Sequence, residues 1–251
     1  MSDLTSAKRP ISIPDRVPVL PVRSTVIFPA GATALQIGFE PNVEALAAHP
    51  DPDLVVAVVP ITDDGYVTEG PLSPDSLEKV AVVARVLDRL NLPGGTVQTT
   101  LSGVRRVRLD RVRFADGYYT AAVHEVEETP ATPQVAADLI ERILSTVSGV
   151  AARVERIPAE VPRILRMNLA DPSRFADLAA ALCHFTLADR DAVVQRLNVA
   201  DRLRYVLERL EESWDRVNDI EREELQPEEA EAQSPQERRS DVRRKMQALQ
   251  A

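Results

Sequence analysis

A chain of 251 residues is long enough for two domains, since one domain usually takes ~100–200 residues. Its 30 basic and 39 acidic residues give a net charge of −9, which argues against a general duplex-binding role, because that role needs a basic surface. Aromatic residues make up only 4% of the chain, too few to supply a stacking platform for single-stranded nucleic acid.

The single cysteine, Cys183, excludes an internal disulfide and any zinc site built on several cysteines, and it is typical of a reducing compartment. No run of about 18 apolar residues occurs, so no membrane span is predicted. The first ten residues also lack the apolar core of a secretory signal. We therefore expect a cytoplasmic protein with no membrane partner.

The first half of the chain has a strand-like pattern. Residues 1–16 are polar with two prolines, which predicts a flexible tail, and a β-rich subdomain is expected over 17–130. One short helix should follow Pro41, with Asn42 as its N-cap. Short apolar runs rich in β-branched residues, typical of a small barrel or sandwich, predict strands at 17–22, 33–39, 54–59, 79–90, 95–101, 104–114 and 118–127.

Three details refine this β-rich pattern. Residues 91–95, Asn-Leu-Pro-Gly-Gly, lie between two strand-like runs and predict a hairpin turn. Both alternating faces of 79–90 are apolar, so this strand is expected to be central in its sheet. Within 104–114 the apolar positions change parity near Asp110, which indicates a bulge or bend of the kind that barrels use at corners.

From Pro133 onward the hydrophobic period is helical, and a helical bundle is expected over 131–226. Thr132 and Pro133 predict the N-cap and first turn of a helix that runs to about 156. Prolines at 158 and 162 end that helix. A short second helix is expected to end near 167, and a third helix to cover 173–185. Asp189 should start a fourth helix over 190–197, and the last helix should begin near 199.

The helix from Val199 has the most regular pattern, because its apolar residues recur at alternating spacings of four and three as far as Ile220. This stripe predicts either a coiled-coil stem that leaves the domain or an amphipathic helix packed on its own bundle. Pro227 stops the helix, and Ser-Pro-Gln-Glu at 234–237 has the capping-box pattern that starts another. Residues 227–251 are therefore expected to form an interrupted helical extension.

No motif for catalysis or cofactor binding is present. The chain lacks a Gly-rich phosphate-binding loop, H-E-x-x-H, G-x-S-x-G and C-x-x-C. Cys183 and His184 are adjacent, but helical neighbours point about 100° apart and do not converge on one metal ion. Lys79 begins a strand without a serine in a suitable local motif, which argues against a Ser–Lys dyad. No catalytic residue, cofactor or metal is therefore expected.

The only basic cluster lies within 104–113, where Arg105, Arg106 and Arg108 are followed by two more arginines. It predicts either an anion or nucleic-acid patch, or an exposed strand face on which the arginines pair with carboxylates. The net charge of −9 favours the second interpretation. The carboxylates expected as partners are Asp88, Asp110 and Asp116.

Three segments occur in a characteristic order. Residues 20–29 are LPVRSTVIFP, 80–112 contain an L-P-G-G-T turn between strands and then G-V-R-R, and 191–212 are DAVVQRLNVADRLRYVLERLEE. Together they resemble the amino-terminal domain of the Lon ATP-dependent protease family over about 17–250. The resemblance implies an α+β fold, with a β-rich PUA-like pseudobarrel followed by a helical bundle that ends in a long helix. Pro227 and Pro235 depart from the family's usually continuous helix.

The resemblance also implies a function. In Lon proteases this module is not catalytic; it recruits unfolded or degron-bearing proteins and supports assembly of a hexamer. The AAA+ and Ser–Lys peptidase modules lie downstream, so this chain is expected to be an excised domain or a truncated paralogue, and to be a monomer or weak dimer by itself. Two alternatives stay open: a stand-alone Lon-domain adaptor, and a PUA-like RNA-binding module.

A receptor for unfolded proteins needs accessible apolar surface. The candidate substrate contacts are two phenylalanines and two prolines on expected loops and strand ends of the barrel. For Phe28 and Phe39 the alternative is that they fill the barrel core. The four candidates are Pro21, Phe28, Pro29 and Phe39.

Overall fold

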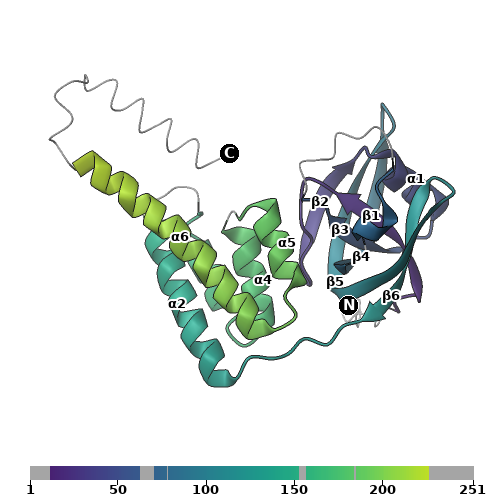
Figure 1. The fold of residues 1–251 in the computed structure, drawn as a ribbon. Coiled ribbons are helices and arrows are strands. Elements are labelled where there is room, and N and C mark those ends of the chain that lie inside the picture. Colours follow the sequence, from purple (N-terminus) through teal and green to yellow (C-terminus); the bar gives the residue numbers. More distant parts are fainter. Residues whose placement is uncertain (1–11, 63–70, 78, 153–156, 184, 226–251) are drawn as a thin grey trace, which may run out of the picture. The chain divides into compact units, whose positions relative to one another are not determined.

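The computed structural model describes residues 12–62, 71–77, 79–152, 157–183 and 185–225, and for 214–225 it describes only the course of the helix. The chain divides into two compact units, Met1–Glu127 and Glu128–Ala251 (Figure 1). Several predicted features lie outside the described residues. They are the tail up to residue 11, His184, the break at Pro227 and the extension over 227–251.

The first unit contains a mixed sheet with short helical segments (Figure 1). The predicted strands are confirmed to within two residues, except that one continuous strand of 20 residues replaces the two expected between 95 and 114. In chain order the elements are β1 (Arg16–Val22), β2 (Ala32–Ile37), α1 (Glu40–Ala48), β3 (Val55–Pro60), η1 (Pro74–Leu77), β4 (Val80–Leu92), β5 (Thr96–Ala115) and β6 (Tyr118–Glu125).

The sheet closes into a barrel. Its strands follow the order β5-β4-β3-β1-β6, and β6 pairs back onto β5. The length of β5 makes this possible, because residues 97–102 pair with β2 and residues 107–115 pair with β6. β1 and β3 run parallel, and the other pairs are antiparallel. The predicted β-rich pseudobarrel is confirmed.

The details predicted for the long strands are also confirmed. β4 lies between β3 and β5, and its first five residues are buried. The turn after Leu92 contains Gly94 and Gly95 at φ values of 92° and 79°. The pairing of β5 with β6 shifts between Asp110 and Arg113, so the change of parity marks a β-bulge that bends β5 where the barrel closes.

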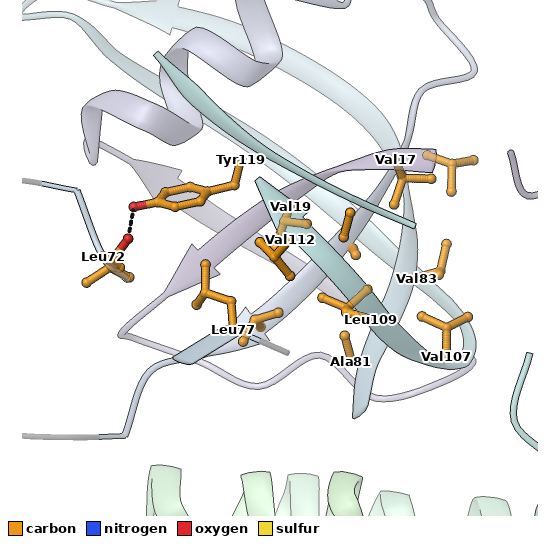
Figure 2. Close-up of a cluster of buried hydrophobic side chains, with 14 of the residues drawn as sticks. Val17, Val19, Leu72, Leu77, Ala81, Val83, Val107, Leu109, Val112 and Tyr119 are labelled. Atoms are coloured by element: carbon orange, nitrogen blue, oxygen red, sulfur yellow. Dashed lines mark hydrogen bonds between the residues drawn. The ribbon is translucent and has the colours of Figure 1, made fainter. Parts of the chain in front are cut away.

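Aliphatic side chains and one tyrosine fill the barrel interior (Figure 2). Tyr119 is fully buried, and its hydroxyl donates a hydrogen bond of 3.0 Å to the carbonyl oxygen of Leu72. A buried tyrosine needs such a partner for its polar end. Because Leu72 precedes η1, this bond ties the connection between β3 and β4 to the core.

Gly103 lies in the middle of β5, at the point where the sequence pattern predicted an interval between two strands. Its N–H donates to the carbonyl oxygen of Gly31 at 2.8 Å, and its own carbonyl accepts from the N–H of Ala30 at 3.0 Å. The backbone before β2 therefore lies directly against β5. Gly103 permits this close approach and does not end the strand.

The helix α1 begins earlier than the sequence predicted. Phe39 is its N-cap, and Pro41 occupies the first turn, where a missing N–H costs nothing. Asn42 is consequently inside the helix and buried, and its Nδ2 donates to the carbonyl oxygen of Pro21 at 2.7 Å. The prediction that Asn42 caps the helix is wrong, because its side chain joins α1 to β1 instead.

The second unit is helical throughout its described elements. Thr132 is the N-cap of the first helix as predicted, although its side chain makes no capping bond. Thr186, and not Asp189, caps the fourth helix, because its Oγ1 accepts from the N–H of Asp189 at 3.1 Å. The helices are α2 (Pro133–Ala151), α3 (Val161–Arg166), α4 (Pro172–Leu182), α5 (Leu187–Gln195) and α6 (Val199–Leu225).

The long helix α6 packs against α2 and α4 (Figure 1). Leu203, Val206 and Leu210 of its apolar stripe are buried, as are Ile143 and Val147 on α2. Up to residue 210 the stripe therefore packs on its own bundle, the second of the two predicted alternatives. Among the described residues, no helix is both long and apolar enough to cross a membrane.

A buried arginine organises the start of this bundle. Arg202 on α6 is fully buried, and its Nη2 lies 2.8 Å from a carboxylate oxygen of Glu128. Its Nη1 donates to the hydroxyl of Ser173 at 2.8 Å, and that hydroxyl donates to the other oxygen of Glu128 at 2.6 Å. The network holds the segment that precedes α2 against α4 and α6.

Candidate functional site

The reactive side chains singled out in the sequence have structural roles. No group of three or more metal-binding side chains occurs among the described residues. Cys183 is buried, and loss of solvation raises the pKa of its thiol to about 12, which keeps it protonated and unreactive at neutral pH. The Nζ of Lys79 donates to the carbonyl oxygen of Pro60 at 2.9 Å. Neither residue has the environment of a nucleophile or a general base.

The four sequence-predicted contact residues do not gather at one place. Pro21 is buried in β1, and Phe28 is only 6% exposed. Pro29 is half-buried. Phe39 is half-buried and packs against the barrel core. The burial of Phe28 favours its alternative role in the core, and of the four only Phe39 lines the surface hollow described next. Substrate contact by these residues stays a prediction.

A hollow of about 480 Å³ lies beside the N-terminal end of α1 in the first unit. Segments far apart in the chain form it: residues 39–44, residue 71 and residues 114–117. Its described lining combines apolar and acidic side chains with one glycine. The lining residues are Phe39, Glu40, Pro41, Glu44, Pro71, Phe114, Asp116 and Gly117.

The tight turn between β5 and β6 forms one wall of this hollow. Asp116 and Gly117 have φ values of 54° and 86°, the left-handed pair that a two-residue hairpin turn requires. The turn lies close to α1, since a Cβ added at Gly117 would lie 3.6 Å from Cγ of Glu44. The ring of Tyr118 also meets His49 edge-on, with 5.4 Å between centroids. These contacts fix the turn against the helix.

Phe114 supplies the most accessible aromatic surface of the hollow. Its side chain is 38% exposed, although its ring lies 4.8 Å from that of the buried Tyr119. The ring is therefore held in place on its inner side and open on its outer side. A fixed aromatic face of this kind binds apolar groups with little loss of side-chain entropy.

Arg89 on β4 fixes the opposite end of α1. Its Nη1 donates to the carbonyl oxygen of Leu46 at 2.9 Å, and its Nη2 donates to that of Asp51 at 2.8 Å. A cation at the C-terminal end of a helix satisfies free carbonyls and offsets the helix dipole. Desolvation lowers the pKa of Arg89 despite the opposing effect of the Asp51 carboxylate. The guanidinium thus holds the helix that carries half of the hollow.

All charged side chains in the described lining of the hollow are acidic. Glu40, Glu44 and Asp116 are exposed carboxylates at its margin, and the described lining contains no basic side chain. The apolar surface comes from phenylalanine and proline, which offer no group for chemistry. This arrangement can bind apolar side chains, and its described lining contains no histidine, cysteine, serine or lysine.

Other large apolar side chains are exposed elsewhere. Leu87 and Leu90 lie near the hairpin between β4 and β5, and Ile164, Met167 and Leu169 lie at the end of α3 and just beyond it. Single exposed apolar side chains are normal on protein surfaces. The hollow is the stronger candidate because it combines apolar surface with concave shape.

The arginines of β5 have partners that fit an exposed strand face. Arg105 forms an ion pair with Glu125, and Arg111 lies 3.4 Å from the carboxylate of Asp110. Arg106 departs from this pattern, since it is only 4% exposed. Of the expected partners, Asp110 is confirmed, whereas Asp116 lines the hollow and the carboxylate of Asp88 accepts the N–H of Thr100. This environment favours the paired strand face over a nucleic-acid patch.

A closed barrel that carries a concave surface of apolar and acidic side chains is typical of a binding module. Residues 16–212 match the family described as the ATP-dependent protease La (LON) substrate-binding domain, so the chain belongs to this family. The matched part is the family's non-catalytic domain, and the resemblance seen in the sequence is confirmed.

Known proteins agree with this assignment. The Lon protease of Escherichia coli strain K12 is 29% identical over 199 residues, which are 79% of this chain and 25% of that protein. Lon protease 2 of Thermus thermophilus is 28% identical over 199 residues, which are 79% of this chain and 24% of that protein. The chain therefore spans about a quarter of the length of these curated relatives.

The fold has a counterpart among solved structures. The N-terminal domain of a Lon protease from the Mycobacterium avium complex matches with a TM-score of 0.59 and 21% sequence identity. The match covers 78% of this chain and 98% of that structure. At this level of identity the likeness establishes a shared α+β fold.

Proposed function

We propose that this chain captures unfolded or degron-bearing proteins for a Lon-type ATP-dependent protease. The observation that carries the proposal is the hollow of about 480 Å³ in the first unit, into which Phe114 presents a partly exposed ring. Membership of a family of substrate-binding domains supports it.

The chemistry of the hollow suits ligands of many sequences. An unfolded chain exposes apolar side chains that a native protein buries, and apolar contact recognises them without reading a fixed pattern of hydrogen bonds. The volume lies within the range of ~300–1,000 Å³ that is usual for ligand pockets. It therefore has room for a large apolar side chain together with part of its neighbour.

The partners of the proposed function are the AAA+ and peptidase parts of a parent protease, in which this module supports assembly of a hexamer. The isolated chain would be a monomer or weak dimer, acting in the cytoplasm. The alternative is a stand-alone adaptor with the same binding surface. The reading frame beyond residue 251 distinguishes the two, because a GPPGVGKT-like motif there indicates an attached motor.

A pair of variants tests the role of the hollow. Phe114→Ser removes the exposed ring, and Leu90→Ser removes an apolar side chain of greater exposure (58%) near the hairpin between β4 and β5. We expect the first variant to bind a fluorescent, reduced and carboxymethylated protein about fivefold or more weakly, since a buried aromatic contact contributes ~1–2 kcal/mol. The second should bind like the unmodified chain.

Cross-linking supplies a second, independent measurement. The same unfolded protein carrying a photoreactive group should attach to residues 39–44 and 114–117 when irradiated with the full chain. Unchanged affinity of the Phe114→Ser variant, together with attachment only to other segments such as 164–169, would contradict the proposal.

A further inference from the structure

We propose that the hollow prefers apolar segments flanked by lysine or arginine over those flanked by aspartate or glutamate. This inference rests on the proposed function, because it names the class of unfolded segment that the hollow takes. Three carboxylates from two elements carry it, Glu40 and Glu44 on α1 and Asp116 in the turn between β5 and β6. All three are exposed, and they surround apolar surface whose described lining holds no cation.

The two glutamates lie one helical turn apart. Residues at positions i and i+4 of a helix share a face, and like charges there repel each other. A cationic side chain placed between them removes this repulsion and adds attraction to both carboxylates. A bound acidic segment would add further repulsion, so the helix itself discriminates by charge.

The charge of Asp116 is not needed for the turn that it forms. At a φ of 54° asparagine or glycine serves a two-residue hairpin turn equally well. Asp116 lines the same hollow as Glu44, and the adjacent Gly117 lies close to the Glu44 side chain. Acidic residues from two segments of the chain therefore line one hollow, and a cation beside the apolar side chain of a bound ligand would be attracted to both segments.

The experiment compares three fluorescent peptides with one shared apolar centre, flanked by two lysines, two glutamates or two serines on each side. Each exposed ion pair contributes about two- to fivefold in affinity at low salt, so the full chain should bind the lysine peptide about tenfold more tightly than the glutamate peptide. In 1 M salt the Debye length falls to about 3 Å, and the preference should fall below about twofold.

Matched variants locate the selectivity. The triple variant Glu40→Gln, Glu44→Gln, Asp116→Asn should lose most of the preference while keeping its affinity for the serine peptide. A control variant removes the same net charge from exposed positions elsewhere: Asp15→Asn, Glu141→Gln and Glu160→Gln. The control should keep the preference, and the single Glu44→Gln variant should lose part of it, which covers the case of a poorly folded triple variant.

Two results would overturn the inference: equal affinity of the unmodified chain for the lysine and glutamate peptides, or an undiminished preference in the Glu44→Gln and triple variants. The failure of this inference can be distinguished from that of the proposed function. If Phe114→Ser weakens all three peptides but the flanking charge makes no difference, the hollow binds unfolded segments without charge selection. If Phe114→Ser leaves all three unchanged and cross-linking attaches the unfolded protein only to other segments, the proposed function itself is wrong.

Discussion

A Cβ added at Gly103 would lie 2.1 Å from the carbonyl oxygen of Phe28. Van der Waals contact between carbon and oxygen needs more than 3 Å, so the two backbones touch at a point where no side chain fits. Together with the hydrogen bonds that join Ala30 and Gly31 to Gly103, this contact holds residues 28–31 against β5. A position that looked like an interval between strands is thus a packing site between two backbones.

The first prediction follows from this contact. Gly103→Ala should lower the free energy of unfolding by ~2–3 kcal/mol, because the obstacle is a backbone carbonyl, which cannot move aside as a flexible side chain would. Gly38→Ala is the control, since its Cβ would meet only Cγ2 of Thr96 at 3.3 Å, and it should change stability by less than ~1 kcal/mol. Urea unfolding measures both. Equal losses in the two variants would contradict the explanation.

A second prediction concerns Arg202. Arg202→Met should lower the free energy of unfolding by ~3 kcal/mol, because the carboxylate of Glu128 and the hydroxyl of Ser173 lose a charged partner inside the bundle. Arg204→Met is a matched control, since Arg204 pairs with Asp201 on the exposed side of the same helix. The control should cost less than ~1 kcal/mol. If Arg202→Met also lowers the free energy of unfolding by less than ~1 kcal/mol, the network contributes no net stability.

A third prediction links β4 to the candidate site. Arg89→Met should lower the free energy of unfolding by ~1–3 kcal/mol, because the carbonyls of Leu46 and Asp51 lose a charged donor. It should also speed amide hydrogen exchange in α1 and weaken binding of an unfolded protein. Arg85→Met, on the same strand as Arg89, removes an exposed ion pair with Asp53 and should leave all three measurements nearly unchanged. Unaltered exchange in α1 of the Arg89 variant would show that the helix is held by other contacts.

Much of the fold could be predicted because its determinants are local. The bulge at Asp110 changes the parity of apolar residues in β5, and the turn before Thr96 contains two glycines. The start of α1 could not be predicted in this way. Asn42 is a good N-cap by type, but in the folded chain its amide meets the carbonyl of Pro21 in a buried contact, which outweighs the local preference.

The candidate site was the least predictable part. Of its residues only Phe39 was predicted from the sequence to contact substrate, because a hollow exists only after 39–44 and 114–117 are brought together across some 70 residues. In the sequence, Phe114 marked the end of a predicted strand, and Asp116 was an expected partner of an arginine. The Asp-Gly pair at 116–117 did carry information, since it predicts a tight turn. Nothing local indicates what that turn packs against.

The fourth prediction concerns Cys183 and alkaline pH. The pKa of the buried thiol is raised from 9.0 to about 12 by desolvation. In the unfolded chain the thiol loses its proton above about pH 9, whereas in the native state it keeps the proton until about pH 12. Between these values the unfolded state binds fewer protons, so this group makes stability fall as pH rises and has no such effect below pH 9.

Cys183→Ala isolates this contribution. Burial and the hydrogen bond to Asp189 raise the pKa of Tyr205 to about 12, which gives a slope of the same sign, but Tyr205 is present in both chains and cancels in the comparison. The difference in unfolding free energy between the two chains should therefore be constant up to about pH 9 and then shift in favour of the alanine variant. Parallel curves between pH 9 and 12, or rapid reaction of the native thiol with a disulfide reagent at pH 8, would show that Cys183 is accessible to solvent.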